Sequence, residues 1–537
     1  MSEPRATASA WAPFRHHAFA LIWTATVVSN VGGWMYNVAT GWLMTSLDPD
    51  PFIVSMVQVA NSLPMFLFAI PAGALVDIVD RRLFLICGEF AIMITSAAFA
   101  VLVWLHLITP NSLLLFSFIV TVGSAITAPA WQAVVVQLVP RSDLSSAVAA
   151  NSLGINVSRA VGPALGGVIA GAAGIAAPFW LNAFSNIGVI AALVWWRPPK
   201  DSAEHLPPEP FGSAVRTGLR HARYNAHLSA TLIRAIGFFA FASAYWALLP
   251  LVARSQIAGG PALYGMLLGA IGASAVAGAF ALPWLKASLD PDRLLAAATV
   301  ATSAATGLFA LAHDAVTAVG ASLVAGASWT VALSTLNVSA QVALPEWVRG
   351  RGLAMYVTVI FGALTLGSAI WGEVAAVAGL PAALFLAAAG AMVAIRLTWR
   401  WKLQTGANVD FSPSMHWAAP VTTRAIEKDR GPVLVTVEYH IDPKNREPFL
   451  EALGQYARER RRDGAYDWRL FEDPAEEGRF IEIFLSDSWL EHLHQHQRVT
   501  KADRVLEQAV RRFHIGSGPK TTHLIGVRAR PERRRPS

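Results

Sequence analysis

Charge and cysteine are both scarce in this sequence of 537 residues. Charged residues make up 14% of the chain and hydrophobic residues 54%, and the mean hydropathy is +0.45, which excludes an ordinary soluble protein of this size. The single Cys87 excludes an intramolecular disulfide, and we expect it to be a small buried packing residue. No glycine-rich phosphate loop with Lys-Ser or Lys-Thr is present, which argues against a nucleotide-driven pump.

Long apolar stretches are abundant instead. They recur from Phe19 to Trp399, and each can cross about 30 Å of hydrocarbon as a helix with a rise of about 1.5 Å per residue. The sequence therefore predicts transmembrane helices over residues 19–45, 52–76, 83–107, 112–138, 147–171, 175–196, 228–252, 263–285, 294–312, 316–342, 353–377 and 380–399. The opening segment lacks the apolar core and cleavage site of a signal peptide, so we expect the first span to stay in the mature protein.

Positive charge is concentrated in every second connection between these spans. The even-numbered connections hold Arg81, Arg82, Arg141, Arg197, Lys200, Arg216, Arg220, Arg223, Lys286, Arg293, Arg349 and Arg351. The odd-numbered connections offer only Arg254. Because Lys and Arg are retained on the cytoplasmic side during insertion, we expect a multi-pass protein of the plasma (inner) membrane with both termini in the cytoplasm. These loops and the basic tail explain the pI of about 9.7, so nucleic-acid binding is not required.

Composition and an internal repeat divide the chain. We expect an N-terminal six-helix bundle (1–196), a Pro-rich cytoplasmic linker (197–227), a second six-helix bundle (228–402), a further linker (403–430), a cytoplasmic domain (431–528) and a disordered basic tail (529–537). The segment 137–167 runs parallel to 341–372, with Gly162 aligned to Gly367 and Gly167 to Gly372. Such repeats are typical of transporters, and they predict two halves of equal topology.

The C-terminal segment has the pattern of a small soluble α+β domain. Alternating apolar residues predict a strand over 433–439, and a helix is expected over 443–462. Strands at 466–471 and 479–485, a helical region at 489–513 and a strand at 522–527 follow. The predicted fold class is therefore an all-α membrane protein of twelve transmembrane helices in two bundles, with a C-terminal ferredoxin-like domain.

The connection between the second and third spans carries the first recognisable motif. Its candidate latch residues are Gly73, Asp77, Arg81 and Arg82. The motif resembles the signature loop of the major facilitator superfamily, although Ile78 and Asp80 replace the usual Arg and Gly. Physically, the carboxylate can accept hydrogen bonds at a helix end and the arginines can bind acids or helix carboxyl ends, so the loop can hold one access state. Anchoring of a short loop by positive charge is the alternative.

The fifth span carries a second motif. It contains Gly162, Pro163, Gly166 and Gly167, in an arrangement similar to the Gly-Pro-x-x-Gly-Gly element of the superfamily's proton-coupled exporters. Small residues let a neighbouring helix approach closely, and the proline bends the span. Helix packing alone also explains these glycines.

Further segments narrow the resemblance. They are Pro129-Ala130-Trp131-Gln132, Leu138-Val139-Pro140, Asn151-Ser152, Ala247-Leu248-Leu249-Pro250-Leu251 and Arg349-Gly350-Arg351. Together they look like the enterobactin-exporter-like branch, also called transmembrane secretion effectors, and the resemblance covers nearly the whole chain. It implies a transporter rather than an enzyme, with no cofactor, that exports siderophores, drugs or related metabolites in exchange for protons.

Charged residues inside the spans are few and are candidates for coupling or for binding substrate charge. They are Glu89, Arg159, Arg234 and Glu373. Each is costly in hydrocarbon, so a functional role is the default hypothesis, with a structural role as the alternative. Arg159 lies near the middle of the fifth span and could bind an anionic substrate or face a carboxylate. The sequence assigns no pairs.

The resemblance also implies a central cavity lined by the first, fourth, seventh and tenth spans. Their mid-membrane residues include Asn30, Trp34, Asn37, Trp131, Gln132, Tyr245, Trp246 and Trp329. Aromatic rings with a few hydrogen-bonding groups suit a bulky organic ligand. Tryptophans near span ends can instead anchor the helix at the membrane interface.

The C-terminal domain offers a histidine pair. His492 and His496 stand one helical turn apart, but a zinc site needs further ligands such as His514 or His523, which the spacing does not establish. We therefore expect no metal. The domain resembles the cofactor-free antibiotic-biosynthesis monooxygenase fold, whose members commonly pair, so self-association is a more natural expectation than catalysis.

Three functions remain open at this stage. Proton-coupled export of a small organic molecule is the leading hypothesis, and proton-coupled import is the second. A membrane-anchored sensor or enzyme that acts through the C-terminal domain is the third. Truncation after Thr405 separates them, because an exporter should keep some transport whereas a sensor or enzyme would lose its activity.

Overall fold

A computed structural model describes residues 11–76, 79–197, 224–345, 348–404, 430–462 and 464–527, together with residues 414 and 427. The linkers expected at 197–227 and 403–430 lie mostly outside these residues, and the tail at 529–537 lies wholly outside them. The chain separates into a helical unit and a second unit that contains the C-terminal sheet. Each unit is described by itself.

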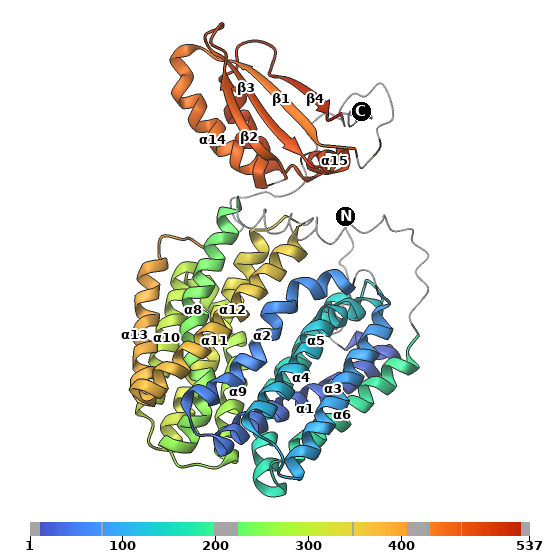
Figure 1. Cartoon of the computed structure of the whole chain (residues 1–537), viewed down its shortest axis with the longest axis vertical. Coiled ribbons are helices and arrows are strands. Elements are labelled where there is room, and N and C mark those ends of the chain that lie inside the picture. Colours follow the sequence, from blue (N-terminus) through green and yellow to red (C-terminus); the bar gives the residue numbers. More distant parts are fainter. Residues whose placement is uncertain are drawn as a thin grey trace, which may run out of the picture. The chain divides into compact units, whose positions relative to one another are not determined.

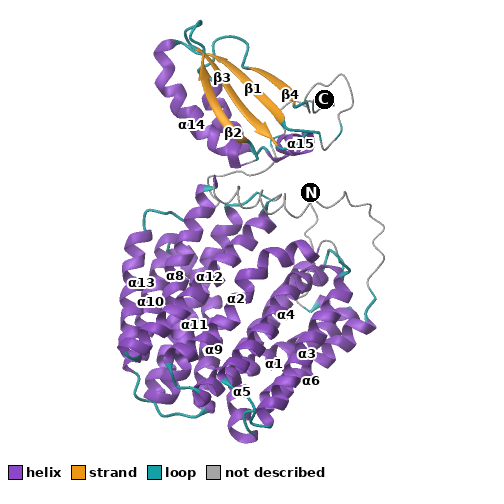
Figure 2. Ribbon diagram, viewed as in Figure 1, coloured by secondary structure: helices purple, strands orange, loops and turns teal. Residues whose placement is uncertain are grey.

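The helical unit consists of two sets of six long helices (Figures 1 and 2). The first set is α1 (His17–Leu47), α2 (Pro51–Val76), α3 (Arg81–Trp104), α4 (Pro110–Gln137), α5 (Leu144–Ala173) and α6 (Ala177–Trp195). The second set is α8 (Ala226–Leu251), extended by the π-helical turn η2 (Val252–Gln256), α9 (Pro261–Ser288), α10 (Pro291–Leu311), α11 (Ala315–Val342), α12 (Arg349–Ala378) and α13 (Leu380–Thr398). Within the described residues, 12 helices are long and apolar enough to cross a membrane. The predicted fold class is confirmed.

Local signals explain where many of these helices begin. Thr109 forms a capping box with Ser112 at the start of α4, and the carboxylates of Asp80 and Asp290 accept hydrogen bonds from the first turns of α3 and α10. Proline also stands in the first turn of α4, α9 and α10, where its missing N–H removes no helical hydrogen bond. Side-chain caps therefore define the starts of these spans.

The internal repeat extends to the backbone. Gly174 ends α5 with a φ of 90°, and Gly379 precedes α13 with a φ of 88°. The two glycines occupy matching turns, between the fifth and sixth helices of each set. A positive φ is costly for residues with a Cβ atom, so both halves need glycine there.

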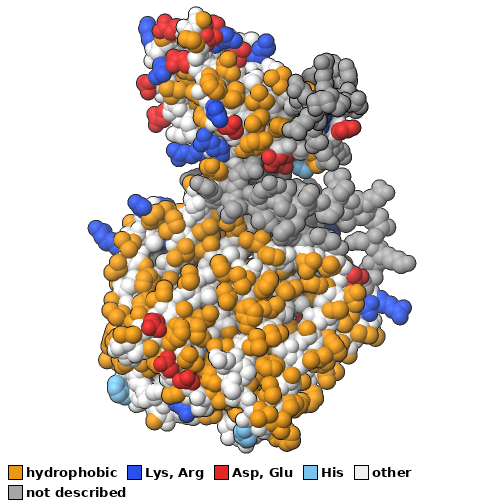
Figure 3. All heavy atoms as spheres, viewed as in Figure 1, with side chains coloured by type: hydrophobic (Ala, Val, Ile, Leu, Met, Phe, Trp, Pro, Cys, Tyr) orange, Lys and Arg blue, Asp and Glu red, His pale blue; other side chains and the backbone are white. Residues whose placement is uncertain are grey.

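Apolar side chains cover the flank of the helical unit, with few charged groups among them (Figure 3). Exposed apolar residues of the membrane unit include Phe90, Val168, Phe184 and Leu366. Lipid is the natural solvent for such a surface. Cys87 is also exposed on α3, so the prediction of a buried cysteine is wrong. An apolar stretch that faces lipid cannot be distinguished by composition from one that faces protein.

The C-terminal sheet has four antiparallel strands in the order β2-β3-β1-β4. They are β1 (Val433–His440), β2 (Tyr466–Glu472), β3 (Arg479–Ser486) and β4 (Lys520–Ile525), and the helices are α14 (Arg446–Arg462), α15 (Trp489–Arg498) and α16 (Lys501–Arg511). Alternate residues of β1 are buried, as expected for a sheet with one covered face. The helical region predicted over 489–513 consists of two helices, because Thr500 starts a new helix with a capping box to Asp503.

Candidate functional site

Helices of the membrane unit run alternately between two ends. The end that carries Arg81, Arg82, Arg141, Lys286 and Arg293 is called the basic end here, and the other is called the opposite end. The contacts between the two bundles decide which end is closed.

Helices α5 and α9 bring the two bundles into backbone contact. A Cβ atom on Gly265 would lie 2.5 Å from the carbonyl oxygen of Pro163, and one on Gly272 would lie 2.5 Å from that of Arg159. Both distances are far below the spacing at which non-bonded atoms pack. Glycine is therefore required on α9 for this contact, which extends from the middle of α5 toward the opposite end.

The small residues predicted on the fifth span lie on its packed faces. A Cβ atom on Gly162 would lie 2.5 Å from the Cβ atom of Trp34, and one on Gly166 would lie 2.8 Å from the Cα atom of Met35. Gly167 faces α9 in the same way. The motif thus joins α5 both to α1 in its own bundle and to α9 in the other.

Two further contacts join the bundles. In the middle of the unit, Thr365 of α12 donates a hydrogen bond of 2.8 Å to the hydroxyl of Ser62 on α2. Near the opposite end, Arg254 of η2 donates a hydrogen bond of 2.5 Å to the hydroxyl of Ser46 and lies over the ring of Trp42 on α1, 5.5 Å from its centroid. These contacts hold the bundles together from the middle to the opposite end.

Arg159 lies beside aromatic side chains of other helices, over the ring of Trp34 and close enough to Tyr245 to interact with it electrostatically. Its guanidinium lies over the ring of Trp34 on α1, 5.7 Å from the centroid. Trp246 of α8 stacks obliquely on Tyr245 at 5.7 Å and meets Trp329 of α11 edge-on at 5.4 Å. The structure therefore brings together five of the residues that the sequence singled out, from α1, α5, α8 and α11.

Three polar atoms in this cluster are buried without a hydrogen-bond partner in the described part of the chain. They are Arg159 Nε, the hydroxyl of Tyr245 and Trp246 Nε1. An unpaired buried donor costs about 1–3 kcal/mol, and more when it is charged. Each such group in a native structure calls for an explanation, such as a functional role or a bound water or ion.

Glu89 forms a separate polar pair with Trp131. The carboxylate is only 7% exposed and accepts a hydrogen bond of 3.0 Å from the indole N–H, which links α3 to α4. Trp131 was expected to line the cavity. Its indole N–H donates to the buried carboxylate, and its place in a cavity stays a prediction.

The latch loop is described only in part. Asp77 lies outside the described residues, and a side chain on Gly73 would meet open space. Arg82 donates hydrogen bonds of 2.7 and 2.6 Å to the carbonyl oxygens of Leu193 and Val194, at the carboxyl end of α6. The positive charge of Arg82 thus compensates the partial negative charge of carbonyl groups that have no partner within the last turn of α6.

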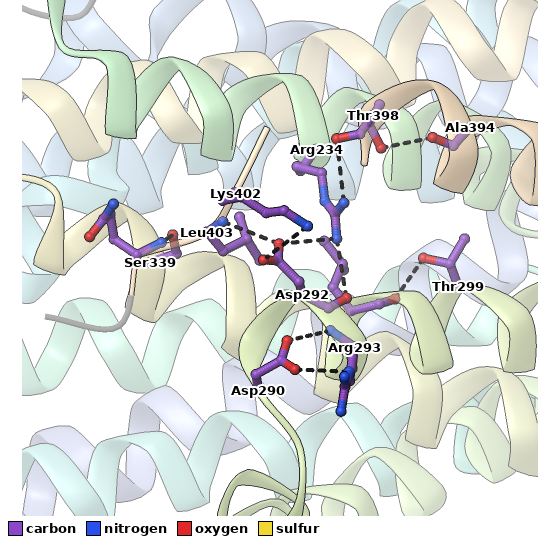
Figure 4. Close-up of polar contacts among 12 residues, drawn as sticks. Arg234, Asp290, Asp292, Arg293, Thr299, Ser339, Ala394, Thr398, Lys402 and Leu403 are labelled. Atoms are coloured by element: carbon purple, nitrogen blue, oxygen red, sulfur yellow. Dashed lines mark hydrogen bonds and ion pairs between the residues drawn. The ribbon is translucent and has the colours of Figure 1, made fainter. Parts of the chain in front are cut away.

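Arg234 belongs to a charged cluster at the basic end of the second bundle (Figure 4). It is 3% exposed and lies 3.5 Å from the carboxylate of Asp292 on α10. It also donates to the carbonyl oxygen of Thr398 at the end of α13, and Lys402 lies 3.9 Å from the same carboxylate. This cluster is remote in sequence from Arg159 and is assembled from α8, α10 and the end of α13.

A buried polar cluster also occupies the C-terminal domain. Glu482 is fully buried and accepts hydrogen bonds from Tyr439 (2.9 Å) and Trp468 (2.8 Å), while Arg460 lies 2.8 Å from it. The charges of Glu482 and Arg460 compensate each other.

His492 of α15 is buried in the same domain. Burial lowers the pKa of His492 to about 3, with a smaller effect from His496 and His523.

A model of the transmembrane secretion effector family matches residues 8–532. The chain belongs to this family.

Two curated relatives carry transporter names. The staphyloferrin A transporter of Staphylococcus aureus is 22% identical over 244 residues, which are 44% of this chain and 60% of that protein. Macrolide efflux protein A of Streptococcus pyogenes is 25% identical over 251 residues, 45% of this chain and 60% of that protein. The chain thus spans less than two thirds of the length of these relatives.

Solved structures show the fold. A POT family transporter in complex with a thioalcohol-conjugated peptide superposes with a TM-score of 0.60 at 12% identity, over 72% of this chain and 96% of that chain. The two-bundle architecture of the major facilitator transporters is thereby confirmed, and the chain is a multi-pass membrane protein.

Within this family fold, the remaining candidate residues are dispersed. Gln132 and Glu373 are exposed, and Asn30 and Asn37 are half-buried on α1. Sequence reasoning missed Asp292, the partner of Arg234. The available signal was an acidic residue in the first turn of α10, a position that favours negative charge. It also missed the aromatic neighbours Phe238 and Phe239 of Trp329, because phenylalanine carries no polar signal.

Proposed function

We propose that this protein exports a small organic anion with a bulky apolar part across the plasma membrane, in exchange for protons. The observation that carries the proposal is Arg159 in the middle of the bundle, beside two further buried donors without partners in the described residues. The names of the two relatives, a staphyloferrin A transporter and a macrolide efflux protein, support a small organic cargo, and the second name supports the outward direction.

The cluster suits an anion chemically. Guanidinium, phenol and indole N–H groups all donate hydrogen bonds, and a carboxylate accepts several at once. The rings of Trp34 and Trp329 offer apolar surface beside these donors. A ligand that combines a carboxylate with an aromatic or macrocyclic body therefore satisfies both parts of the site.

Glu89 is our candidate for the proton-binding group, with Asp77 as the second. Burial penalises an ionised carboxylate far more than a neutral one, so proton uptake changes how strongly Glu89 holds Trp131 on α4. A proton bound from one side and released on the other can thus alter the packing of α3 and α4.

The described contacts fit an inward-facing state. They join the bundles from the middle to the opposite end, and the basic end is cytoplasmic if positive charge is retained inside. In this state the Arg159 cluster would receive its ligand from the cytoplasm, as export requires.

Efflux from cells tests the proposal. Cells that produce wild type, Arg159→Gln or Arg159→Lys are loaded with paired carboxylate and neutral aromatic compounds, with and without a protonophore. We expect protonophore-sensitive export of carboxylates by wild type, a loss of at least tenfold in Arg159→Gln and partial retention in Arg159→Lys. Uptake instead of efflux would indicate import.

Arg293→Gln is the matched control. Its side chain is 72% exposed, and the ion pair it forms within the described residues is local, with Asp290 at the same helix start at 3.1 Å. Removing that charge should leave export unchanged at equal protein levels. Equal export by Arg159→Gln and Arg293→Gln would refute an anion site at Arg159.

A further inference from the structure

Three histidines converge on the covered face of the C-terminal sheet. His492 and His496 stand one turn apart on α15, and their Nε2 atoms lie 3.2 Å from each other. His523 comes from β4, where it pairs in register with Val435. Because directly opposed residues share a face and Val435 is buried, His523 points to the side that the helices cover.

We propose that His492, His496 and His523 form a binding site for a divalent transition metal such as Zn²⁺. One ligand nitrogen from each ring lies within 4.8 Å of the others. Two nitrogens bound to tetrahedral zinc at about 2.0–2.1 Å lie about 3.3 Å apart, close to the spacing of the first pair. His523, which is half-buried, is the third ligand, and the spacings of up to 4.8 Å within the cluster would have to shorten toward 3.3 Å when the ion binds.

The surroundings support a metal rather than simple packing. His492 is 1% exposed, so a metal ion bound to its Nε2 atom would be shielded from bulk water. Trp489 packs against the rings of His492 and His523, at centroid distances of 5.6 and 6.4 Å, and shields one side. An apolar side chain beside the ligands excludes water and lowers the local dielectric constant, which strengthens the interaction of the ligands with a cation.

The positive charge of Arg460 does not oppose a bound cation strongly. Arg460 contributes to the electrostatics of His492, but its guanidinium pairs with the buried carboxylate of Glu482 at 2.8 Å. The local charge is therefore compensated. Imidazole ligands suit zinc, copper, nickel and iron, whereas calcium and magnesium need oxygen ligands. Three histidines leave one position of a tetrahedral ion open to water or to a small ligand.

The site ties an edge of the sheet to a helix. Strand β4 pairs with β1 on one side, and α15 follows directly after β3. A bound metal would cross-link β4 to α15, so occupancy would change the stability of the domain and not the Arg159 cluster in the membrane.

Metal binding by the full-length protein tests the inference. Protein purified without a polyhistidine tag is equilibrated with Zn²⁺, and bound metal is counted by mass spectrometry and titrated by calorimetry. We expect one ion per chain, and a loss of affinity of about 100-fold in His523→Gln and His496→Gln. Bound Co²⁺ should give a visible absorption band typical of tetrahedral coordination.

His494→Gln is the control, because His494 lies on the same helix outside the three-residue cluster. It should bind one ion with unchanged affinity. Circular dichroism establishes that each variant is folded. Less than one ion in wild type, or equal affinity in His523→Gln and His494→Gln, would overturn the proposed site, and neither result bears on export.

Discussion

A methyl group placed at Gly272 should force the two bundles apart. In Gly272→Ala the new carbon would lie 2.5 Å from the carbonyl oxygen of Arg159 and 2.7 Å from the Cα atom of Ala160. Both neighbours are backbone atoms of α5, so no side chain can rotate away. Overpacking of this kind costs about 1–3 kcal/mol, and the cost applies only while α5 and α9 touch. We expect the state closed at the opposite end to lose about 5- to 150-fold in population.

Spin labels report this change directly. Asn111 and His313 are exposed at the opposite end, one in each bundle. Spin labels are attached to cysteines at these two positions (Asn111→Cys and His313→Cys), and Cys87→Ser removes the native thiol. Pulsed electron resonance in detergent gives the distribution of label distances. We expect the longer distance to gain population in Gly272→Ala.

Gly307→Ala is the matched control for this measurement. Gly307 also lies within a helix, and a Cβ atom there would meet no other atom within 4 Å. Both substitutions add the same helix propensity, so only the contact differs. If the two variants gave the same distance distribution, the idea that α5–α9 packing closes the opposite end would be refuted.

Three further predictions concern charges. Arg82→Gln should destabilise the protein by about 1–2 kcal/mol, because it removes two charged hydrogen bonds at the end of α6, whereas Arg81→Gln should have little effect in the same thermal assay in detergent. Asp292→Ala should cost about 3 kcal/mol, because it leaves buried Arg234 without its carboxylate; a change below 1 kcal/mol would contradict this. Since the pKa of His492 is lower in the folded protein than in the unfolded chain, the unfolded state binds more protons below about pH 6.5. The stability of α15 should therefore fall by about 1.4 kcal/mol per pH unit from there toward pH 3, measured by amide hydrogen exchange, with a flatter profile in His492→Gln.

The sequence predicted the helical fold closely because the length and hydropathy of each apolar stretch identify it as a membrane span. The largest difference at a span start is at α12, predicted from 353 and observed from Arg349. Span ends depend on capping, as at Asp80 and Asp290. The same chemistry divides the predicted helical region 489–513 at Thr500, where a capping box starts a second helix.

The candidate site was predictable only in part. Arg159 stood out because a charge within a span is rare, and Trp34 and Trp246 followed from the expected arrangement of helices. Which charges pair was not accessible, because Arg234 and Asp292 are 58 residues apart and only the packing of α8 against α10 joins them. The same applies to His523, which reaches α15 through the register of β4.

In each bundle an arginine donates hydrogen bonds to carbonyl oxygens at the carboxyl end of the last helix, but the two arginines come from different places. Arg82 comes from the first turn of α3, whereas Arg234 comes from within α8 and is fixed by Asp292. The first cap is half-exposed, and the second is buried in a packed cluster. A conformational change can release the first at a small cost, but it must leave the second intact or expose a buried ion pair. Rearrangement at the basic end should therefore begin in the first bundle, next to Glu89 and Trp131.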